Sequence, residues 1–365
     1  MLERLATMVS LARWLGPLTP ATAQPARVRR RRVRVPSIRG GDGTRAFDAW
    51  VYEPRGGGVR GALLVLPGLH YLGPADPRLD RFNRILAASG VRVLCPFLPT
   101  FARLHVGPAL GPDAIAAYDV LCGLADHPPQ RPGVFSISTG SLPAAVVCAR
   151  RSPAGWVAFG GYHDFAACVR FSLSGGQDGV SADPLNRPVV YLNLLRFMDD
   201  APADTAPLER ALRRFVEQTW GRPEMKVGGA WRVVSDRLAP TLDPVSRRVF
   251  LRATGAEDPR GEAGLRALTS AGDAFACMNP APSIALYHGS SVIVHGREDD
   301  VVPVAQARAL HASLCAAGGD SRLFLTGMYG HTGSSRFAVA DAGRELRSML
   351  GIVEGIARCA ATRRN

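Results

Sequence analysis

Lysine is almost absent from this sequence: Lys226 is the only lysine among 44 basic residues, and the others are arginines. With 31 acidic residues, the formal charge at pH 7 is 44 − 31 = +13. A basic chain can bind nucleic acid or an anionic membrane. Here the arginines are scattered, except for a run at residues 29–32 within an arginine-rich strand pattern at 27–35. Because no zinc finger, RNA-binding aromatic motif or heptad repeat follows that run, we expect no nucleic-acid partner.

The chain also lacks paired cysteines and the common cofactor motifs. Its seven cysteines form no CxxC pair, and several lie in apolar runs, which favours buried, reduced thiols. There is no HExxH motif and no Cys/His cluster at the spacing of metal ligands. The glycine-rich residues 40–43 precede a strand, whereas phosphate-binding loops precede a helix. We therefore expect no metal and no cofactor.

No stretch approaches the roughly 18 apolar residues that span a bilayer. Residues 1–26 start basic and imitate a signal-peptidase site at 21–23, but Arg13 interrupts the apolar stretch. The segment predicts an amphipathic helix that packs on the body of the protein or makes peripheral contact with a membrane surface. This favours a cytoplasmic protein over an exported one. The expected apolar face of this helix consists of Leu5, Met8, Val9, Ala12 and Leu15. Leu11 lies off that face.

The rest of the chain has the composition of a globular protein, with 47% hydrophobic and 21% charged residues. In residues 27–170 and 283–365, short apolar strands alternate with helical patterns. This alternation predicts an α/β core with a mostly parallel sheet and helices on both faces, preceded by an antiparallel pair. The eight expected strands cover residues 33–35, 46–52, 61–66, 91–94, 133–136, 156–159, 291–295 and 321–325.

The strand rhythm stops in residues 171–282, where helical stretches appear at 189–199 and 206–220. We expect this segment to be a helical cap inserted into the core. Some of its apolar residues could line a hydrophobic acyl or alcohol pocket, or simply pack the cap on the core: Tyr191, Leu194, Leu195, Phe197 and Met198.

The first chemical motif is VFSISTGS at residues 134–141, where a buried strand ends and a helix begins. It matches the nucleophile elbow G-x-S-x-G around Ser138, in which a tight turn exposes the serine hydroxyl above the sheet. Small residues are needed two positions away on either side because the backbone is crowded there. Gly140, two residues after Ser138, is the second glycine of the motif. Ser136, two residues before it, replaces the first glycine with another small residue.

Two more loops follow predicted strands. Asp299 comes after the strand at 291–295, and His331 comes six residues beyond the strand at 321–325. Ser138, Asp299 and His331 therefore occur in the order serine, acid, histidine, each after a parallel strand. Such loops meet at one edge of the sheet, where α/β folds place their ligands. The joint pattern predicts a catalytic triad.

With these motifs the chain resembles the α/β-hydrolase superfamily, and in particular its serine esterases and lipases, over about residues 27–359 apart from the cap. The resemblance implies an eight-stranded α/β-hydrolase sheet, with Ser138 as nucleophile and His331 as base. The family's acid loop usually reads G-x-x-D-x-x-V-P, which favours Asp299. Asp300, the next residue, is one alternative acid. Asp164, which follows the predicted strand at 156–159, is another, because some relatives carry the acid after that strand.

The segment LPGLH at residues 66–70 resembles the family's H-G-x-G stretch, with Pro67 in place of the histidine and His70 in place of the second glycine. The resemblance implies that the backbone amides of Leu69 and Thr139 form the oxyanion hole. His70 is a candidate substrate-binding residue, with structural packing as the alternative.

The resemblance thus implies a serine hydrolase, in particular a carboxylesterase, that cleaves small-molecule esters or related acyl compounds through an acyl-enzyme. An acyltransferase or a catalytically silent binding protein of the same fold are the alternatives. A peptidase is a further one, although no propeller-like repeat precedes the core.

Overall fold

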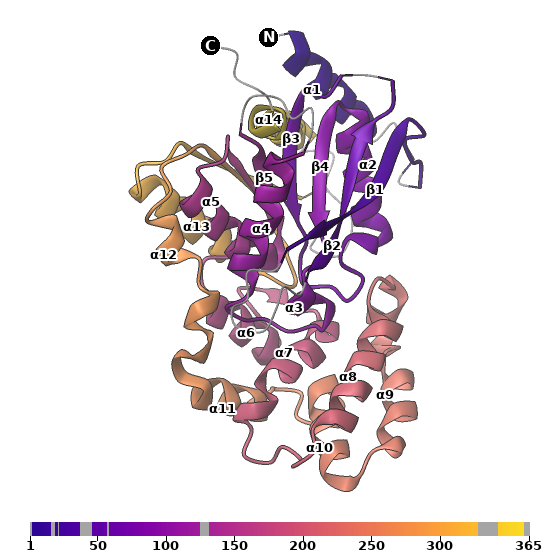
Figure 1. The fold of residues 1–365 in the computed structure, drawn as a ribbon. Helices are drawn as coiled ribbons and strands as arrows, with labels where there is room; N and C mark the ends of the chain where they lie inside the picture. Colours follow the sequence, from indigo (N-terminus) through magenta and orange to yellow (C-terminus); the bar gives the residue numbers. More distant parts are fainter. Residues whose placement is uncertain are drawn as a thin grey trace.

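The chain forms an α/β structure around one large sheet. A computed structural model describes residues 2–15, 19–20, 22–36, 46–56, 58–124, 131–327 and 342–360. Among them, eight strands form a sheet in the order β1-β2-β4-β3-β5-β6-β9-β10. Strands β1 to β5 are labelled in Figure 1. The strands are β1 (Val28–Val35), β2 (Phe47–Pro54), β3 (Gly61–Leu66), β4 (Val91–Pro96), β5 (Gly133–Ile137), β6 (Trp156–Phe159), β9 (Ser291–Gly296) and β10 (Ser321–Thr326).

All neighbours from β4 to β10 pair in parallel, and β1 and β2 form the expected antiparallel edge. The predicted fold class is therefore confirmed. The inner strands are continuous apolar runs because helices cover both faces, so successive side chains enter opposite cores. Within β3, Leu64 and Leu66 face one hydrophobic cluster, whereas Leu63 and Val65 face the other.

Two groups of helices provide these cores. One face is covered by α4 (Leu110–Cys122), α5 (Ser141–Arg151) and α13 (Val304–Ala316). The other face is covered by α1 (Leu2–Leu15), α2 (Pro77–Ala88) and α14 (Ala342–Ala360). A short helix, α3 (Pro99–Ala102), follows β4.

The predicted N-terminal helix is present as α1, and it packs against α14 and α2. Its buried face differs from the predicted one: Leu11 is fully buried, whereas Leu5 and Val9 are exposed. The apolar periodicity was misleading because α1 presents only a narrow stripe to its two neighbours, and that stripe passes through Leu11. Peripheral membrane contact stays a prediction. None of the described helices combines the length and apolar character that a membrane span requires.

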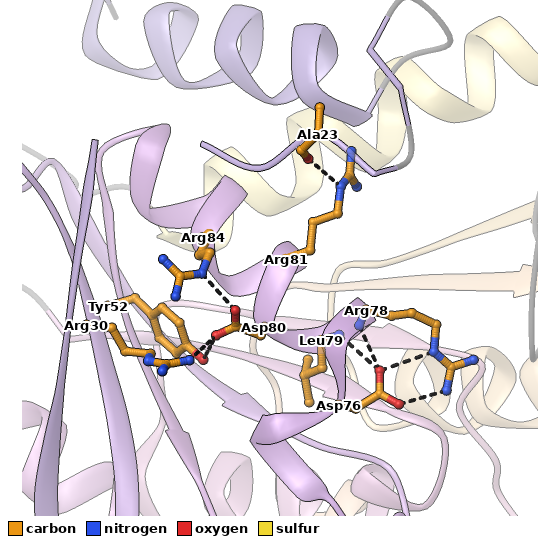
Figure 2. Close-up of polar contacts among 9 residues, drawn as sticks. All are labelled: Ala23, Arg30, Tyr52, Asp76, Arg78, Leu79, Asp80, Arg81 and Arg84. Atoms are coloured by element: carbon orange, nitrogen blue, oxygen red, sulfur yellow. Dashed lines mark hydrogen bonds and ion pairs between the residues drawn. The ribbon is translucent and has the colours of Figure 1, made fainter. Parts of the chain in front are cut away.

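Helix α2 is fixed to the edge of the sheet by one carboxylate (Figure 2). Asp80 accepts hydrogen bonds from Arg30 and Tyr52, each at 2.8 Å, and from Arg84 at 2.7 Å. Burial opposes the ionisation of Asp80, but hydrogen bonds from these donors outweigh it and hold its pKa below the usual range. Arg81 on the same helix donates to the carbonyl of Ala23 at 2.8 Å, which ties the N-terminal segment to α2.

The segment between β6 and β9 is largely helical, as predicted. It contains α6 (Phe165–Ser174), α7 (Arg187–Leu194), α8 (Ala206–Thr219), α9 (Arg232–Leu238), α10 (Pro244–Thr254), α11 (Glu262–Ala271), α12 (Ala281–Ile284) and a small hairpin, β7 (Gly176–Gln177) with β8 (Val180–Ser181). Helices α7 to α11 gather beyond the end of the sheet near α3 and α6, the helices that follow β4 and β6 (Figure 1). The segment therefore lies at the carboxyl ends of the parallel strands.

Candidate active site

Ser138 occupies a strained turn between β5 and α5. Its φ is +50°, a left-handed conformation that costs energy for any residue except glycine. A short 3-10 turn, Ser138–Gly140, then leads directly into α5. A Cβ on Gly140 would lie 2.8 Å from the carbonyl oxygens of both Leu66 and Pro67, so only glycine fits there. The turn has the geometry of a nucleophile elbow.

The structure also explains the unusual Ser136 two positions before the nucleophile. Ser136 is fully buried, and its Oγ accepts a hydrogen bond of 2.9 Å from the indole nitrogen of Trp156 on the neighbouring strand β6. A buried indole N–H needs such an acceptor. The serine therefore replaces glycine because it completes a hydrogen bond inside the core.

Asp299 is held in a fixed orientation in the loop after β9. It is 3% exposed, and its Oδ1 accepts hydrogen bonds from the amides of Val301 (2.9 Å) and Val302 (2.8 Å). The Nε2 of His295, a fully buried side chain at the end of β9, lies 3.4 Å from its Oδ2 and 2.8 Å from the carbonyl of Val302. His295 was not identified from the sequence, although its position four residues before Asp299 was a usable signal.

The two alternative acids have other partners. The Oδ2 of Asp300 lies 2.7 Å from Nζ of Lys226, which is also 2.7 Å from Asp183. Asp183 is almost fully buried, and burial raises its pKa although Lys226 opposes that effect. Asp164 caps α6 by accepting a hydrogen bond of 3.1 Å from the amide of Ala167. The single lysine of the chain thus ties the inserted segment to the loop after β9.

The loop after β10 carries the predicted base, but His331 lies outside the residues that the structure describes. The start of this loop is anchored by Glu345 on α14, which is 1% exposed. Glu345 accepts hydrogen bonds from the hydroxyl of Thr326 at 2.6 Å and from the amide of Gly327 at 3.0 Å.

The structure brings the two predicted oxyanion residues together. The amide of Leu69 donates a hydrogen bond of 2.8 Å to the hydroxyl of Thr139, the residue that follows Ser138. The Leu69 amide is therefore directed at the Thr139 side chain in this structure. Because that hydroxyl accepts from Leu69, its own proton can be donated to another acceptor.

His70 belongs to an aromatic wall between core and inserted segment. Its ring stacks on Tyr71 at 4.7 Å between centroids and lies 5.4 Å from Trp220. Burial lowers the pKa of His70 and outweighs the opposite effect of the nearby Asp76 carboxylate. The Nδ1 of His70 accepts a hydrogen bond of 3.2 Å from the amide of Leu72, which leaves the proton of the neutral ring on Nε2.

Ser138, Thr139 and His70 line a cavity of about 910 Å³, which also extends towards α2 and α14. Its walls are mostly apolar and come from both core and insertion. They include Val106, Tyr162, Phe165, Val189, Leu194, Trp220 and Phe275. Of the five apolar residues singled out from the sequence, only Leu194 lines the cavity. Tyr191, Leu195 and Met198 are instead buried among the helices of the insertion.

The described residues contain neither a disulfide nor a cluster of metal-ligating side chains. All seven cysteines are free; Cys95, Cys148 and Cys359 are buried as expected, whereas Cys122, Cys277 and Cys315 are exposed. The described residues contain no group of three or more His, Cys, Asp and Glu that could hold a metal.

A mostly parallel eight-stranded sheet with a strained serine turn after a central strand is the arrangement of the α/β-hydrolase fold, and the chain has that fold. No protein-family model and no curated protein matches the sequence. Several solved structures are similar. The Pyrococcus horikoshii acylaminoacyl peptidase shares 12% identity at a TM-score of 0.46, with 89% of this chain and 40% of that chain covered.

A Mycobacterium tuberculosis puromycin-hydrolyzing peptidase shares 13% identity at a TM-score of 0.46, with 89% and 39% of the two chains covered. Carboxyl esterase 2 from Tuber melanosporum shares 13% identity at a TM-score of 0.47, with 92% and 87% covered. The matched part of the two peptidases is thus less than half of their length.

Proposed function

We propose that this protein is a serine hydrolase that cleaves carboxylic esters or related acyl compounds, with Ser138, His331 and Asp299 as its triad. The proposal rests on the strained turn at Ser138, which lines the cavity. Gly140 in the same turn packs tightly against the backbone of Leu66 and Pro67. A non-glycine residue held at positive φ at the end of a buried strand is costly, and such strain is concentrated at functional sites.

In the proposed reaction, Ser138 attacks the acyl carbon while His331 takes the hydroxyl proton. The carbon–oxygen bond to the leaving alcohol then breaks, and His331 returns the proton to that alcohol. Water attacks the acyl-enzyme with the same histidine as base, which releases the acid and restores Ser138. Asp299 holds the imidazole and stabilises its charged form. The two amides that bind Oδ1 of Asp299 support this role, because they fix the orientation of the carboxylate, whose Oδ2 lies 3.4 Å from Nε2 of His295.

Thr139 belongs to the proposed machinery as well. Because the Leu69 amide is directed at the Thr139 hydroxyl, we assign that hydroxyl, together with the Thr139 amide, to the stabilisation of the oxyanion. The Leu69 amide then polarises the hydroxyl from behind. This differs from the expectation that Leu69 and Thr139 contribute backbone amides alone.

The inserted segment, which we assign as a cap over about residues 171–282, supports an apolar acyl or alcohol group as the preferred substrate. Phe165, Val189 and Phe275 offer apolar surface on the cavity wall, and transfer of such a group out of water contributes about 25 cal/mol per Å². Lys226 is paired with both Asp300 and Asp183, and the charged residues that line the cavity, four acidic and three basic, sum to −4 + 3 = −1, so the cavity presents little net charge to a neutral ester.

Labelling with a fluorophosphonate tests the proposal, because this probe reacts with activated serines. The native chain should be labelled and Ser138→Ala should not. Ser172→Ala is the matched control, since Ser172 also lines the cavity and should leave labelling unchanged. A native protein that resists labelling would favour a silent binding protein, and labelling that persists in Ser138→Ala would reject this serine as nucleophile.

A further inference from the structure

A second cleft lies at the opposite end of the sheet from Ser138. It has a volume of about 520 Å³ and is lined by the start of β1, the end of β2 and the start of β4. Four arginines and one acidic residue contribute to it: Arg29, Arg31, Arg55, Arg92 and Glu53. The charge of its walls is therefore +4 − 1 = +3.

The register of the edge strands places these side chains together. Arg29 is directly opposite Glu53 in the antiparallel pair, and Arg31 lies two residues further along the same face of β1. Glu53 lies between two guanidinium groups, at 2.9 Å from Nε of Arg92 and 3.6 Å from Nε of Arg31. Arg92 is 5% exposed, so its guanidinium is held in place at the base of the cleft.

Arg29 and Arg55 also line the cleft, but unlike Arg31 and Arg92 they do not pair with Glu53. Neither side chain makes an ion pair or hydrogen bond within the part of the chain that the structure describes. The opposite face of β1 contrasts with this arrangement. There Arg30 binds Asp80 (Figure 2). Arg30 also stacks over Trp50 at 3.7 Å, and Arg32 and Arg34 both pair with Asp48. The arginine run thus has one face on which every arginine is paired with a carboxylate, and another face on which Arg29 has no such partner among the described residues.

Protection of an exposed sheet edge explains charged residues on β1, because they discourage pairing with another chain. It does not explain why the arginines of one face converge on a cleft with a buried guanidinium at its base. Planar guanidinium groups bind phosphate oxygens in pairs of parallel hydrogen bonds, and a fixed, partly desolvated cluster is the arrangement that strengthens them.

We propose that this cleft binds a phosphate-bearing anion. Arg29, Arg31 and Arg55 contact the phosphate oxygens, and Glu53 positions Arg31 and Arg92 beneath them. The anion is either a soluble phosphate or diphosphate compound or the headgroup of an anionic phospholipid, since both present the same oxygens. This site is independent of the proposed hydrolase activity, because Ser138 lies at the other end of the sheet.

Calorimetric titration with inorganic pyrophosphate tests the cleft. The native chain should bind one equivalent, and the double variant Arg29→Gln/Arg55→Gln should bind at least about tenfold more weakly, which is the contribution of a charge-assisted hydrogen bond. The matched control is Arg32→Gln/Arg34→Gln, which removes the same charge from the opposite face of the same strand. It should retain the native affinity within about twofold, since long-range charge alone is screened by salt.

Vesicle binding distinguishes the two sources of the anion. If a headgroup is the ligand, the native chain sediments with phosphatidylserine vesicles and not with phosphatidylcholine vesicles, pyrophosphate releases it, and the Arg29/Arg55 variant stays in solution. If the ligand is soluble, pyrophosphate binds and vesicles do not. Absence of pyrophosphate binding to the native chain, or equal weakening in both double variants, would overturn the proposal. Fluorophosphonate labelling of Ser138 is measured alongside and should be the same in all these variants.

Discussion

The two ends of the sheet differ in how their charged side chains are paired. At the carboxyl end, Asp299 is buried and accepts hydrogen bonds from two amides, and Lys226 pairs with the carboxylates of both Asp300 and Asp183. At the amino end, Arg29 and Arg55 add positive charge to a cleft in which Glu53, the one acid among its described lining residues, already lies against Arg31 and Arg92. A nearly neutral cavity with oriented groups suits acyl chemistry, whereas an excess of guanidinium suits anion binding. The variants below test whether each end depends on the arrangement described for it.

The largest effect is expected at Asp299, the proposed triad acid. Asp299→Asn should lower kcat for ester hydrolysis by about 10⁴-fold, because an amide neither selects the required imidazole tautomer nor stabilises its charged form. Steady-state hydrolysis of p-nitrophenyl acetate measures it. Asp300→Asn and Asp164→Asn are the controls and should each stay within about tenfold of the native rate, a range set by indirect effects on positioning. If kcat falls further in either control than in Asp299→Asn, the residue changed in that control is the triad acid instead of Asp299.

Thr139→Val should lower kcat by about 10²- to 10³-fold, the range for loss of one oxyanion donor, with little change in KM. Valine keeps the shape of threonine but has no hydroxyl for the Leu69 amide or the oxyanion. Thr139→Ser restores the hydroxyl and should recover most of the rate. Native activity in the valine variant would show that the backbone amide suffices.

Ser136→Ala should lower the free energy of unfolding by about 1–3 kcal/mol, because the buried indole N–H of Trp156 loses its acceptor. Denaturation by urea measures the change. The double variant Ser136→Ala/Trp156→Phe removes both partners and should lose less than the sum of the single changes. Additive losses would mean that the hydrogen bond does not explain the serine at this position.

The smallest effect is expected at Asp80 on α2, which pairs with Arg30 on the face of β1 opposite Arg29. Asp80→Asn should lower the free energy of unfolding at pH 7 by about 1 kcal/mol, since the amide keeps part of the hydrogen bonding but no charge. The native pKa of Asp80 is depressed, so its contribution is fully present above the usual value of 3.8 and is lost as the pH falls through the folded pKa. The difference between the two proteins should therefore shrink below about pH 4. A difference that grows on acidification would contradict this account.

Much of the fold could be predicted from the sequence because its signals are local. Five of the eight strands (β3, β4, β5, β6 and β9) are short apolar runs buried on both faces, and each is followed by a helix or a loop with recognisable composition. The order of Ser138, Asp299 and His331, each after a parallel strand, is the basis on which the sequence predicts the chemistry at the carboxyl edge of the sheet. Asp299 and Asp300, in contrast, are adjacent in sequence, and only the amides of Val301 and Val302 and the ammonium group of Lys226 distinguish them.

The sequence by itself determined the periodic apolar strands, the small residues at the serine turn and the excess of arginine. The tertiary structure decided which partner each polar group meets. It placed Trp156 against Ser136, turned the Leu69 amide towards Thr139, and paired Arg30 with Asp80 while Arg29 faces an open cleft. The physical reason is that backbone conformation and burial follow from local pattern, whereas hydrogen bonds and ion pairs join residues that are distant in the chain. Their energies depend on distances of a few ångströms that only packing sets.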